Sequence, residues 1–292
     1  QVAVWTNLSH DHLDYHGDMD AYGAAKAQLF AQPGLRTAIL NADDPFSAAI
    51  AAALPASVNC LRYSVGGADA ELRLSGLSFD KQGLRGRLHS PWGSAALRCP
   101  LLGQFNASNL LAALGAAITA GLALEQAVAA ARSLEPVAGR MEPLADSGGP
   151  LVVIDYAHTP DALTQVLAAL RPQVGGRLIA VFGCGGDRDR GKRAEMAAAA
   201  SAGADLSFVT SDNPRSEDPA AIIADIEAGM SGDYTALVDR GAAIRAAVAA
   251  ADDEDCVLIA GKGHEDYQLV GGERLPFSDS EQARLALRER AQ

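Results

Sequence analysis

Residues 151–170, LVVIDYAHTPDALTQVLAAL, combine an apolar run, a short polar segment and a helical pattern. The run LVVID is apolar without interruption, as in a strand that is covered on both faces of a sheet. Thr159 is a favourable N-cap residue and Pro160 suits the first helical turn, so we expect a helix to begin there. The polar group Asp155 to His158 then lies at the carboxyl end of the strand, where parallel sheets bind ligands.

The same strand-then-helix order continues to the C-terminus. Further strands are expected at RLIAVFG (177–183), LSFVT (206–210), YTALV (234–238) and CVLIAG (256–261). Further helices are expected at KRAEMAAAASAG (192–203), from Pro219 to about Met230, at AAIRAAVAAA (242–251) and at EQARLALRER (281–290), where Ser278 and Glu281 form a capping box. Apolar strands that alternate with helices indicate an α/β fold with a parallel sheet covered on both faces.

Residues 1–137 follow a different pattern. The region from about Leu61 to Arg98 is rich in glycine and alternates polar with apolar residues, which predicts antiparallel hairpins. Two alanine-rich helical segments follow between Asn106 and Leu134. The segment EPVAGRMEPL (135–144) contains prolines and a glycine and is typical of a linker. We therefore expect two domains, at residues 1–137 and 138–292.

The composition restricts the class of partner. The net charge of −12 argues against nucleic acid and anionic membranes, which bind basic surfaces. No apolar run is long enough to span a bilayer, and the N-terminus lacks the pattern of a signal peptide. The cysteines are scattered and suit a reducing cytoplasm better than a disulfide or zinc framework. The opening QVAVWTNLS has the pattern of a strand entering a loop, so we expect the chain to begin inside a larger protein.

A glycine-rich basic loop, GGDRDRGKR (185–193), follows the strand expected at 177–183. Gly186 to Lys192 match the G-x-x-x-x-G-K pattern of a P-loop. The next residue is Arg193, however, where a P-loop carries the hydroxyl that binds magnesium, and two aspartates inside the loop would repel phosphates. We therefore reject a P-loop. The basic side chains still suit carboxylates or phosphates, although such a loop standing alone is more often only solvated.

Two more polar loops follow expected strands: SDNPRSEDP (211–219) and GKGHED (261–266). Asp218 and Pro219 are explained as the N-cap and first residue of a helix, but the preceding Asp-Asn-Pro-Arg group is not. The two prolines stiffen that loop, and Glu265 suits a cationic amine. Four polar clusters at the ends of successive strands of one sheet favour a ligand-binding site there.

The segment HDHLDYH (10–16) concentrates histidines and aspartates near the N-terminus. Zinc binding is one interpretation, but no cysteine lies close in the sequence and the spacing differs from His-Glu-x-x-His. A structural role is the commoner one for any single histidine.

The motifs of the chain closely resemble those of the Mur ligases. They are TNLSHDHLDYHGDM (6–19), AAKAQLF (24–30), GQFNASNLLAA (103–113), GRME (139–142), DYAHTPDAL (155–163), FGCGGDRDRGKR (182–193), DNPRSEDP (212–219) and GKGHEDYQ (261–268). Together they run through essentially the whole chain. The resemblance implies an α/β fold, with a central ATPase domain that is truncated at its N-terminus and lacks its P-loop, followed by a Rossmann-like domain that binds an amino acid.

Within that family the motifs are most similar to those of the diaminopimelate-adding members. The resemblance implies an ATP-dependent amide ligase of peptidoglycan precursor synthesis, which joins meso-diaminopimelate to UDP-N-acetylmuramoyl-L-alanyl-D-glutamate through an acyl phosphate. It implies ATP and Mg²⁺ as cofactors, small-molecule substrates, no nucleic acid and no membrane insertion, and a monomer in the cytoplasm. Because the P-loop is absent, we expect the chain alone to be inactive.

The resemblance also assigns roles to individual residues. Those implied to bind meso-diaminopimelate are Arg188, Asp212, Asn213, Pro214, Arg215, Gly261 and Glu265. Those implied to contact ATP are Asn106, Asn109, Arg140, Asp155 and His158. Lys26 and His158 match catalytic positions, and Lys26, as a carbamylated lysine, and His12 match metal-binding positions. Arg215 is the discriminating residue, because it would pair with the distal carboxylate that lysine lacks.

Other functions stay open. One alternative is a lysine-adding or folylpolyglutamate-type ligase, which the preferred amino acid would distinguish. Another is a non-catalytic fragment that keeps the amino-acid pocket but does not turn over ATP. A dinucleotide-binding Rossmann domain is disfavoured, because no strand is followed by G-x-G-x-x-G.

Overall fold

The computed structural model describes residues 1–8, 13–144 and 149–291. Two compact units divide the chain. The first comprises Gln1–Phe79, Gly83–Pro100 and Gln104–Leu134, and the second comprises Asp80–Gln82, Leu101–Gly103 and Glu135–Gln292. Each unit has its own sheet and is described by itself.

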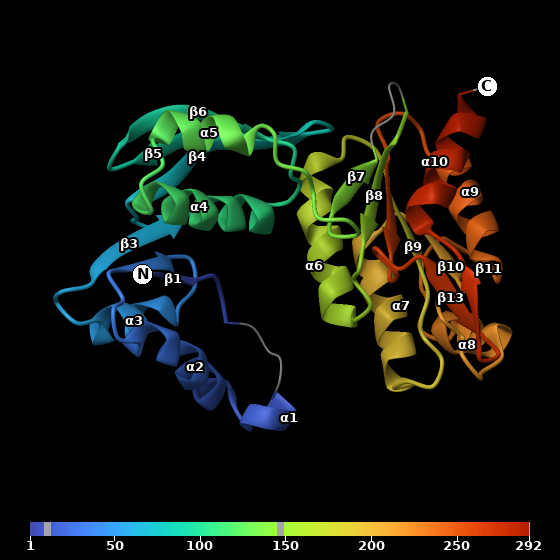
Figure 1. The fold of residues 1–292 in the computed structure, drawn as a ribbon. Coiled ribbons are helices and arrows are strands. Elements are labelled where there is room, and N and C mark those ends of the chain that lie inside the picture. The colour runs from blue at the N-terminus through green and yellow to red at the C-terminus, as the bar shows by residue number, and fades with distance from the viewer. Residues whose placement is uncertain (9–12, 145–148, 292) are drawn as a thin grey trace. The chain divides into compact units, whose positions relative to one another are not determined.

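The first unit contains one mixed sheet in the order β1-β2-β3-β4-β5-β6 (Figure 1). Its strands are β1 (Val2–Trp5), β2 (Thr37–Asn41), β3 (Asn59–Ser64), β4 (Leu72–Asp80), β5 (Gly83–Ser90) and β6 (Gly93–Cys99). Its helices are α1 (Leu13–His16), α2 (Met19–Ala27), η1 (Gln28–Ala31), α3 (Ser47–Ala53), α4 (Gln104–Thr119) and α5 (Leu124–Ala131). The two helices expected between residues 106 and 134 are confirmed as α4 and α5.

The glycine-rich region of the first unit is only partly a set of hairpins. β5 and β6 pair antiparallel, as predicted. β3 and β4 instead pair in parallel, with Tyr63 opposite Leu72, so that part of the prediction is wrong. The segment between β3 and β4 is longer than a tight hairpin turn, which lets the chain cross over before the next strand begins.

The second unit is the expected α/β layer structure. Its main sheet has the order β11-β10-β9-β12-β8-β7. Its strands are β7 (Glu142–Leu144), β8 (Leu151–Asp155), β9 (Leu178–Phe182), β10 (Leu206–Thr210), β11 (Tyr234–Leu237), β12 (Cys256–Ala260), and a separate hairpin of β13 (Tyr267–Val270) and β14 (Glu273–Pro276). Its helices are α6 (Pro160–Leu170), η2 (Arg171–Gln173), α7 (Gly191–Gly203), α8 (Pro219–Glu227), α9 (Arg240–Ala250) and α10 (Asp279–Arg290).

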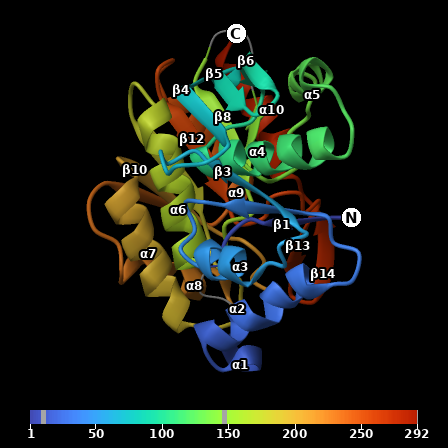
Figure 2. The ribbon, with the colours of Figure 1, turned by 90° about the vertical axis from the view of Figure 1, so that its left-hand side faces the viewer.

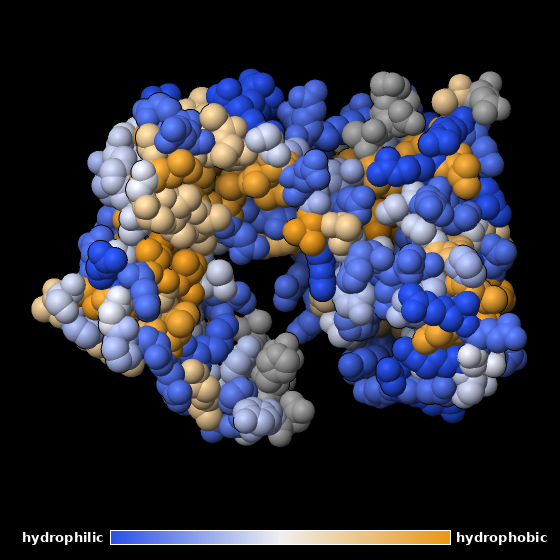
Figure 3. Space-filling view, in the orientation of Figure 1, coloured by the Kyte–Doolittle hydropathy of each residue, from blue (hydrophilic) through white to orange (hydrophobic). Residues whose placement is uncertain are grey.

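The strands of this sheet alternate between two apolar cores. Val153, Ala180 and Leu258 pack with α6, α7 and α8, whereas their neighbours Val152 and Val181 pack with α9 and α10 on the other face. Helices α6 and α7 pack against each other on the first of these faces (Figure 2). Both faces are therefore buried, which explains the uninterrupted apolar runs. The outer surface of this unit seen in Figure 3 is largely hydrophilic.

The local signals for helix starts are confirmed. Thr159 caps α6 by accepting a hydrogen bond from the Ala162 backbone N–H, Asp218 caps α8, and Ser278 caps α10. Strands β8 to β12 are parallel, as predicted. Three strands of this unit were not predicted: β7, which pairs antiparallel with β8 at the sheet edge, and β13 and β14, which form the hairpin.

Within the described residues, none of the helices combines the length and the apolar character that crossing a bilayer requires.

Candidate functional site

A cavity of about 440 Å³ lies at the carboxyl ends of β8, β9, β10 and β12. Four polar segments line it, and each follows one of these strands. The lining residues are Tyr156, His158, Gly183, Cys184, Gly185, Arg188, Asp189, Lys192, Met196, Asp212, Asn213, Arg215, Gly261 and Glu265. The structure thus brings together six of the seven residues expected to bind the amino acid. The seventh, Pro214, is buried between Asn213 and Arg215 in the loop after β10.

Arg215 is held in an uncommon backbone conformation. Its φ is +53°, in the left-handed region that few side chains adopt without support. The β13–β14 hairpin supplies that support, because the Arg215 N–H donates to the Leu269 carbonyl at 2.8 Å and the Gly271 N–H donates to the Arg215 carbonyl at 2.7 Å. A functional side chain on a supported, strained backbone is typical of a preorganised site.

The Arg215 guanidinium lies across the glycines of the basic loop. Its Nη1 donates to the Gly186 carbonyl at 2.7 Å. A Cβ on Gly185 would lie 2.8 Å from Nη1, and a Cβ on Gly186 would lie 1.9 Å from the Pro214 carbonyl oxygen. Gly186 is therefore needed for the two loops to approach, whereas a Cβ on Gly185 would meet the movable end of the Arg215 side chain. The other N–H groups of this guanidinium have no hydrogen-bond partner among the described residues.

Glu217 ties the basic loop to the Asp-Asn-Pro-Arg loop. Its Oε1 accepts from the Asp187 N–H at 2.6 Å and from Arg193 Nη2 at 2.8 Å. Its Oε2 accepts from Arg190 Nη2 at 3.3 Å. The Arg193 hydrogen bond, supported by the Asp187 N–H, lowers the pKa of Glu217 from 4.5 to about 2. Arg193 itself is buried, so the Arg193–Glu217 ion pair holds the two loops together from the protein interior.

Because the pKa of Glu217 is lowered in the folded state, the stability of the fold should depend on pH in the acid range. A carboxyl whose folded pKa lies below its unfolded value stabilises the fold above the unfolded pKa, and that contribution is lost as the pH falls through the folded pKa. We expect Glu217→Gln to remove the part of the wild-type stability loss that occurs between pH 4.5 and about 2. Urea unfolding across this range measures it, with the exposed Glu195→Gln on α7 as the control. An unchanged acid profile for Glu217→Gln would contradict the assignment.

Asp212 presents a buried carboxylate to the cavity. Its side chain makes no hydrogen bond to any described residue, and burial raises its pKa. A Cβ on Gly261 would lie 2.6 Å from Asp212 Oδ2, so only glycine leaves room for this carboxylate. A buried carboxylate without a hydrogen-bond donor is costly unless cations lie close to it, and Arg240 and Lys262 offset only part of that cost, since the pKa stays raised. Asp212 therefore suits an ammonium group of a ligand.

The cavity carries charges of both signs. Arg188, Lys192 and Arg215 supply cations, while Asp212 and Glu265 supply carboxylates. A ligand with both carboxylate and ammonium groups is complementary to such a lining. Cys184 contributes no nucleophile, because burial raises its pKa to about 12 and keeps the thiol protonated.

The residues expected near ATP in the second unit lie beside the amino-acid cavity. Arg140 lies 4.7 Å from the Tyr156 ring, and the Tyr156 and His158 rings are 4.8 Å apart. Asp155 has a different environment: its oxygens accept from the Met141 N–H and the Ala157 N–H, each at 2.8 Å. Burial outweighs these bonds and raises the pKa of Asp155. The carboxylate thus holds the preceding linker, where Met141 has a φ of +46°.

The remaining candidates belong to the first unit. Asn106 and Asn109 lie three residues apart on α4. Lys26 Nζ donates to the Asn7 carbonyl at 2.7 Å and lies 4.9 Å from the Trp5 ring, which suits an ammonium better than an anionic carbamate. His12 lies outside the described residues. Among residues 1–8, 13–144 and 149–291, no cluster of His, Cys, Asp or Glu is placed to hold a metal.

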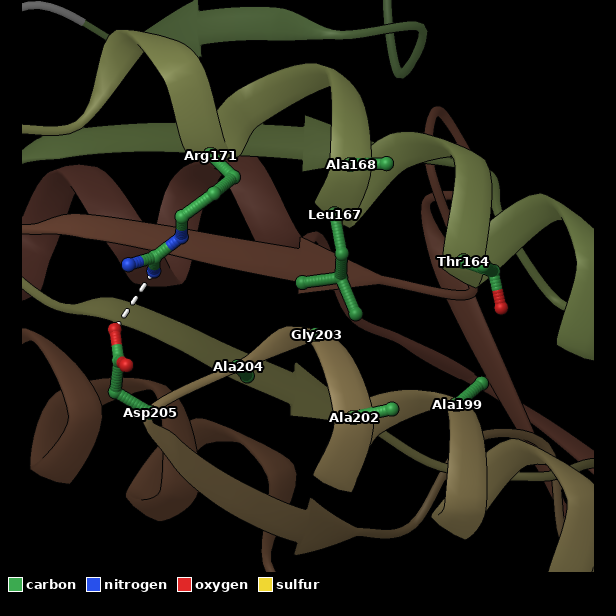
Figure 4. Close-up of a pocket in the computed structure, with 9 residues that line it drawn as sticks. All are labelled: Thr164, Leu167, Ala168, Arg171, Ala199, Ala202, Gly203, Ala204 and Asp205. Atoms are coloured by element: carbon green, nitrogen blue, oxygen red, sulfur yellow. Dashed lines mark hydrogen bonds and ion pairs between the residues drawn. The ribbon is translucent and has the colours of Figure 1, made fainter.

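A second cavity, of about 400 Å³, lies between α6 and α7. Its walls are mainly alanines and Leu167, and Arg171 Nη2 pairs with Asp205 Oδ2 at 2.7 Å (Figure 4). It contains none of the residues expected from the sequence to bind a ligand.

Several residues that lie behind the lining of the first cavity were not assigned from the sequence. Lys262 lies inside the GKGHED motif, which was the available signal for it. Arg240 and Asp279 form a fully buried ion pair, with Nε donating to Oδ1 at 2.7 Å, and no local pattern marks either residue. Gln268, on the unpredicted hairpin, donates to the Asp212 carbonyl at 2.8 Å.

Known proteins share both halves of this arrangement. Residues 1–117 match the family model of the Mur ligase middle domain, and residues 139–263 match that of the Mur ligase glutamate ligase domain. UDP-N-acetylmuramoyl-L-alanyl-D-glutamate--2,6-diaminopimelate ligase of Ectopseudomonas mendocina (strain ymp) is 52% identical over 288 residues, which cover 98% of this chain and 59% of that protein. The chain therefore spans about three fifths of the length of the curated relatives it matches.

Solved structures of ligases also match this chain over most of its length. A structure of a UDP-N-acetylmuramoyl-L-alanyl-D-glutamate--2,6-diaminopimelate ligase matches with a TM-score of 0.77 and 44% identity, over 100% of this chain and 61% of that one. E. coli FolC in complex with ADP matches with a TM-score of 0.62 and 25% identity, over 90% of this chain and 59% of that one. The chain belongs to the Mur ligase family and contains that family's middle and C-terminal domains.

Proposed function

We propose that this chain is the amino-acid-binding part, together with a truncated ATP-binding domain, of an ATP-dependent ligase that adds meso-2,6-diaminopimelate to UDP-N-acetylmuramoyl-L-alanyl-D-glutamate. The cavity of mixed charge around Arg215 carries the proposal. Diaminopimelate has two carboxylates and two ammonium groups, which match the cations and carboxylates that line the cavity. The 52% identity to a ligase named for that amino acid supports the same substrate.

The proposed reaction forms an amide in two steps. The γ-carboxylate of the D-glutamyl substrate attacks the γ-phosphorus of ATP, ADP leaves, and an acyl phosphate results. The amine of diaminopimelate then attacks the acyl carbon, and inorganic phosphate leaves as the amine loses a proton. The chain contributes mainly by position and charge, because the cavity holds the amine in place and basic side chains neutralise oxygen anions.

Arg215 is the proposed selector of the amino acid. Its free N–H groups would bind the distal carboxylate in the planar, bidentate manner that favours arginine. L-lysine lacks this carboxylate and would leave the guanidinium without a partner, so the site discriminates by a missing polar contact. Asp212 and Glu265 would bind the ammonium groups.

The nucleotide and metal sites are proposed from the family resemblance. Arg140, His158 and either Asn106 or Asn109 would contact ATP, with Asp155 acting through the linker that it holds. Mg²⁺ would neutralise phosphoryl oxygens, with carbamylated Lys26 and His12 as its expected ligands. The described surroundings of Lys26 fit its ammonium form, and they give this part of the proposal no support.

Calorimetry on the 292-residue chain tests the substrate. We expect meso-diaminopimelate to bind, and L-lysine to bind at least about tenfold more weakly because it lacks the distal carboxylate. The titrations are run with and without ADP and magnesium. Equal affinity for the two amino acids would favour a lysine-adding ligase. Failure of both to bind under either condition would contradict the amino-acid site.

A non-catalytic binding fragment is the alternative for the chain as printed. It predicts diaminopimelate binding without release of phosphate from ATP when both substrates are supplied. We also propose that the protein acts as a monomer in the cytoplasm, where the nucleotide-linked substrate would be made. Sedimentation analysis of the chain tests the first of these two statements.

A further inference from the structure

Lys262 is a fully buried lysine beneath the amino-acid cavity, with an exposed fraction of 0%. Its Nζ donates to Asn213 Oδ1 at 3.1 Å and to Glu265 Oε2 at 3.1 Å. It also lies 5.4 Å from the centre of the Tyr267 ring. Lysine is rarely fully buried unless its charge is paired. The contacts with Asn213 and Glu265 provide that pairing, so Lys262 acts on these two side chains as well as filling space.

These contacts determine the orientation of the Asn213 amide. Oδ1 accepts from Lys262 Nζ and also from the Leu269 backbone N–H at 3.0 Å. Two donors on one side leave the amide a single sensible orientation, with Nδ2 on the other side. Nδ2 accordingly donates to Glu265 Oε2 at 2.9 Å. Asn213 is therefore engaged mainly with protein groups.

Glu265 has one oxygen occupied and one available. Oε2 accepts from both Asn213 and Lys262, whereas Oε1 makes no hydrogen bond to a described residue. We propose that Lys262 is a positioning residue, which fixes Asn213 and Glu265 so that Glu265 Oε1 can accept a hydrogen bond from an ammonium group of the amino-acid substrate. This inference rests on the proposed function, because it assigns a role at the same site.

The charge of Lys262 also lets two carboxylates share the site. Asp212 and Glu265 both line the cavity, and like charges held close together oppose each other's ionisation. Burial favours the neutral form of Glu265, but the hydrogen bonds from Asn213 and Lys262 outweigh burial and lower its pKa. A neutral side chain at position 262 would remove this support and leave a half-buried carboxylate without its cation.

Lys262→Met tests the proposal, since it keeps most of the unbranched side chain and removes its charge and donors. We expect the pKa of Glu265, followed by carbon-detected NMR titration, to rise. Diaminopimelate binding, measured by calorimetry, should weaken at least about tenfold. The weakening should increase as the pH falls toward the raised pKa of Glu265, which loss of packing alone would not produce. Should Lys262→Met fail to fold, Lys262→Gln also removes the charge while keeping an amide donor group, and the same rise in the Glu265 pKa is expected.

Arg274→Met is the matched control. Arg274 also lies 3.9 Å from the Tyr267 ring, but it pairs with Asp266 on the surface, and among the described residues it makes no hydrogen bond or ion pair with Asn213 or Glu265. We expect it to change neither the Glu265 titration nor binding. An unchanged Glu265 pKa in Lys262→Met would overturn the positioning role. If instead that pKa rises but the wild-type chain binds no diaminopimelate, the proposed substrate fails while the network is upheld.

Discussion

Arg215→Lys is expected to weaken binding of meso-diaminopimelate by roughly thirtyfold to a hundredfold, which corresponds to about 2–3 kcal/mol. Binding of ADP to the same chain should change little. Lysine keeps the positive charge but cannot place two parallel N–H groups on one carboxylate, so the loss measures the bidentate geometry rather than the charge. Calorimetry with both ligands gives the comparison directly.

The backbone does not confound this substitution. Arg215 has a φ of +53°, and its N–H and carbonyl are held by Leu269 and Gly271. Lysine and arginine meet the same steric cost in the left-handed region, so the exchange leaves the strain unchanged. The Nη1 hydrogen bond to the Gly186 carbonyl is lost or altered. A small loss of thermal stability is therefore expected alongside the loss of binding.

Arg190→Lys is the control for Arg215→Lys. Arg190 belongs to the neighbouring basic loop, its side chain is 69% exposed, and it does not line the cavity. The same exchange there should leave diaminopimelate binding unchanged, since an exposed ion pair contributes little. Equal losses in the two variants would show that loop charge in general, and not Arg215, attracts the ligand.

Local sequence signals predicted most of the second unit. The apolar runs predicted strands β8 to β12. Thr159 and Asp218 predicted the starts of α6 and α8, because an N-cap acts within a single helical turn. The polar clusters gather in one cavity because parallel strands end at one edge of a sheet. The family motifs then supplied roles that spacing alone could not.

Features that depend on distant contacts were not predictable in the same way. The β13–β14 hairpin turns at Gly271 and Gly272, both with positive φ, and this Gly-Gly pair is the one local signal for the hairpin. Nothing local reveals that the hairpin holds the backbone of Arg215. The parallel pairing of β3 with β4 is likewise set by tertiary packing rather than by alternation.

Arg240→Met is expected to give the largest loss of stability, about 3–5 kcal/mol in the free energy of unfolding of the second unit. Arg240 and Asp279 are both 0% exposed at their side chains. Nη2 also donates to the Ala260 carbonyl at 2.9 Å, at the end of β12. The substitution would leave the Asp279 carboxylate buried without its cation. Hydrogen exchange of β12 amides reports on this unit, whereas both tryptophans, Trp5 and Trp92, belong to the first.

Replacing both partners separates the two sources of that loss. In Arg240→Met combined with Asp279→Leu, no charge is left buried alone, so much of the stability should return. Recovery should stop short of the wild-type value, because the Ala260 carbonyl still lacks its donor. Arg274→Met, which breaks an ion pair with both side chains more than half exposed, should change stability little.

A double variant no more stable than Arg240→Met would show that the uncompensated charge is not what destabilises the single variant. The loss would then be assigned to the hydrogen bonds that Arg240 donates to the Ser211 and Ala260 carbonyls, which directly precede Asp212 and Gly261 in the chain.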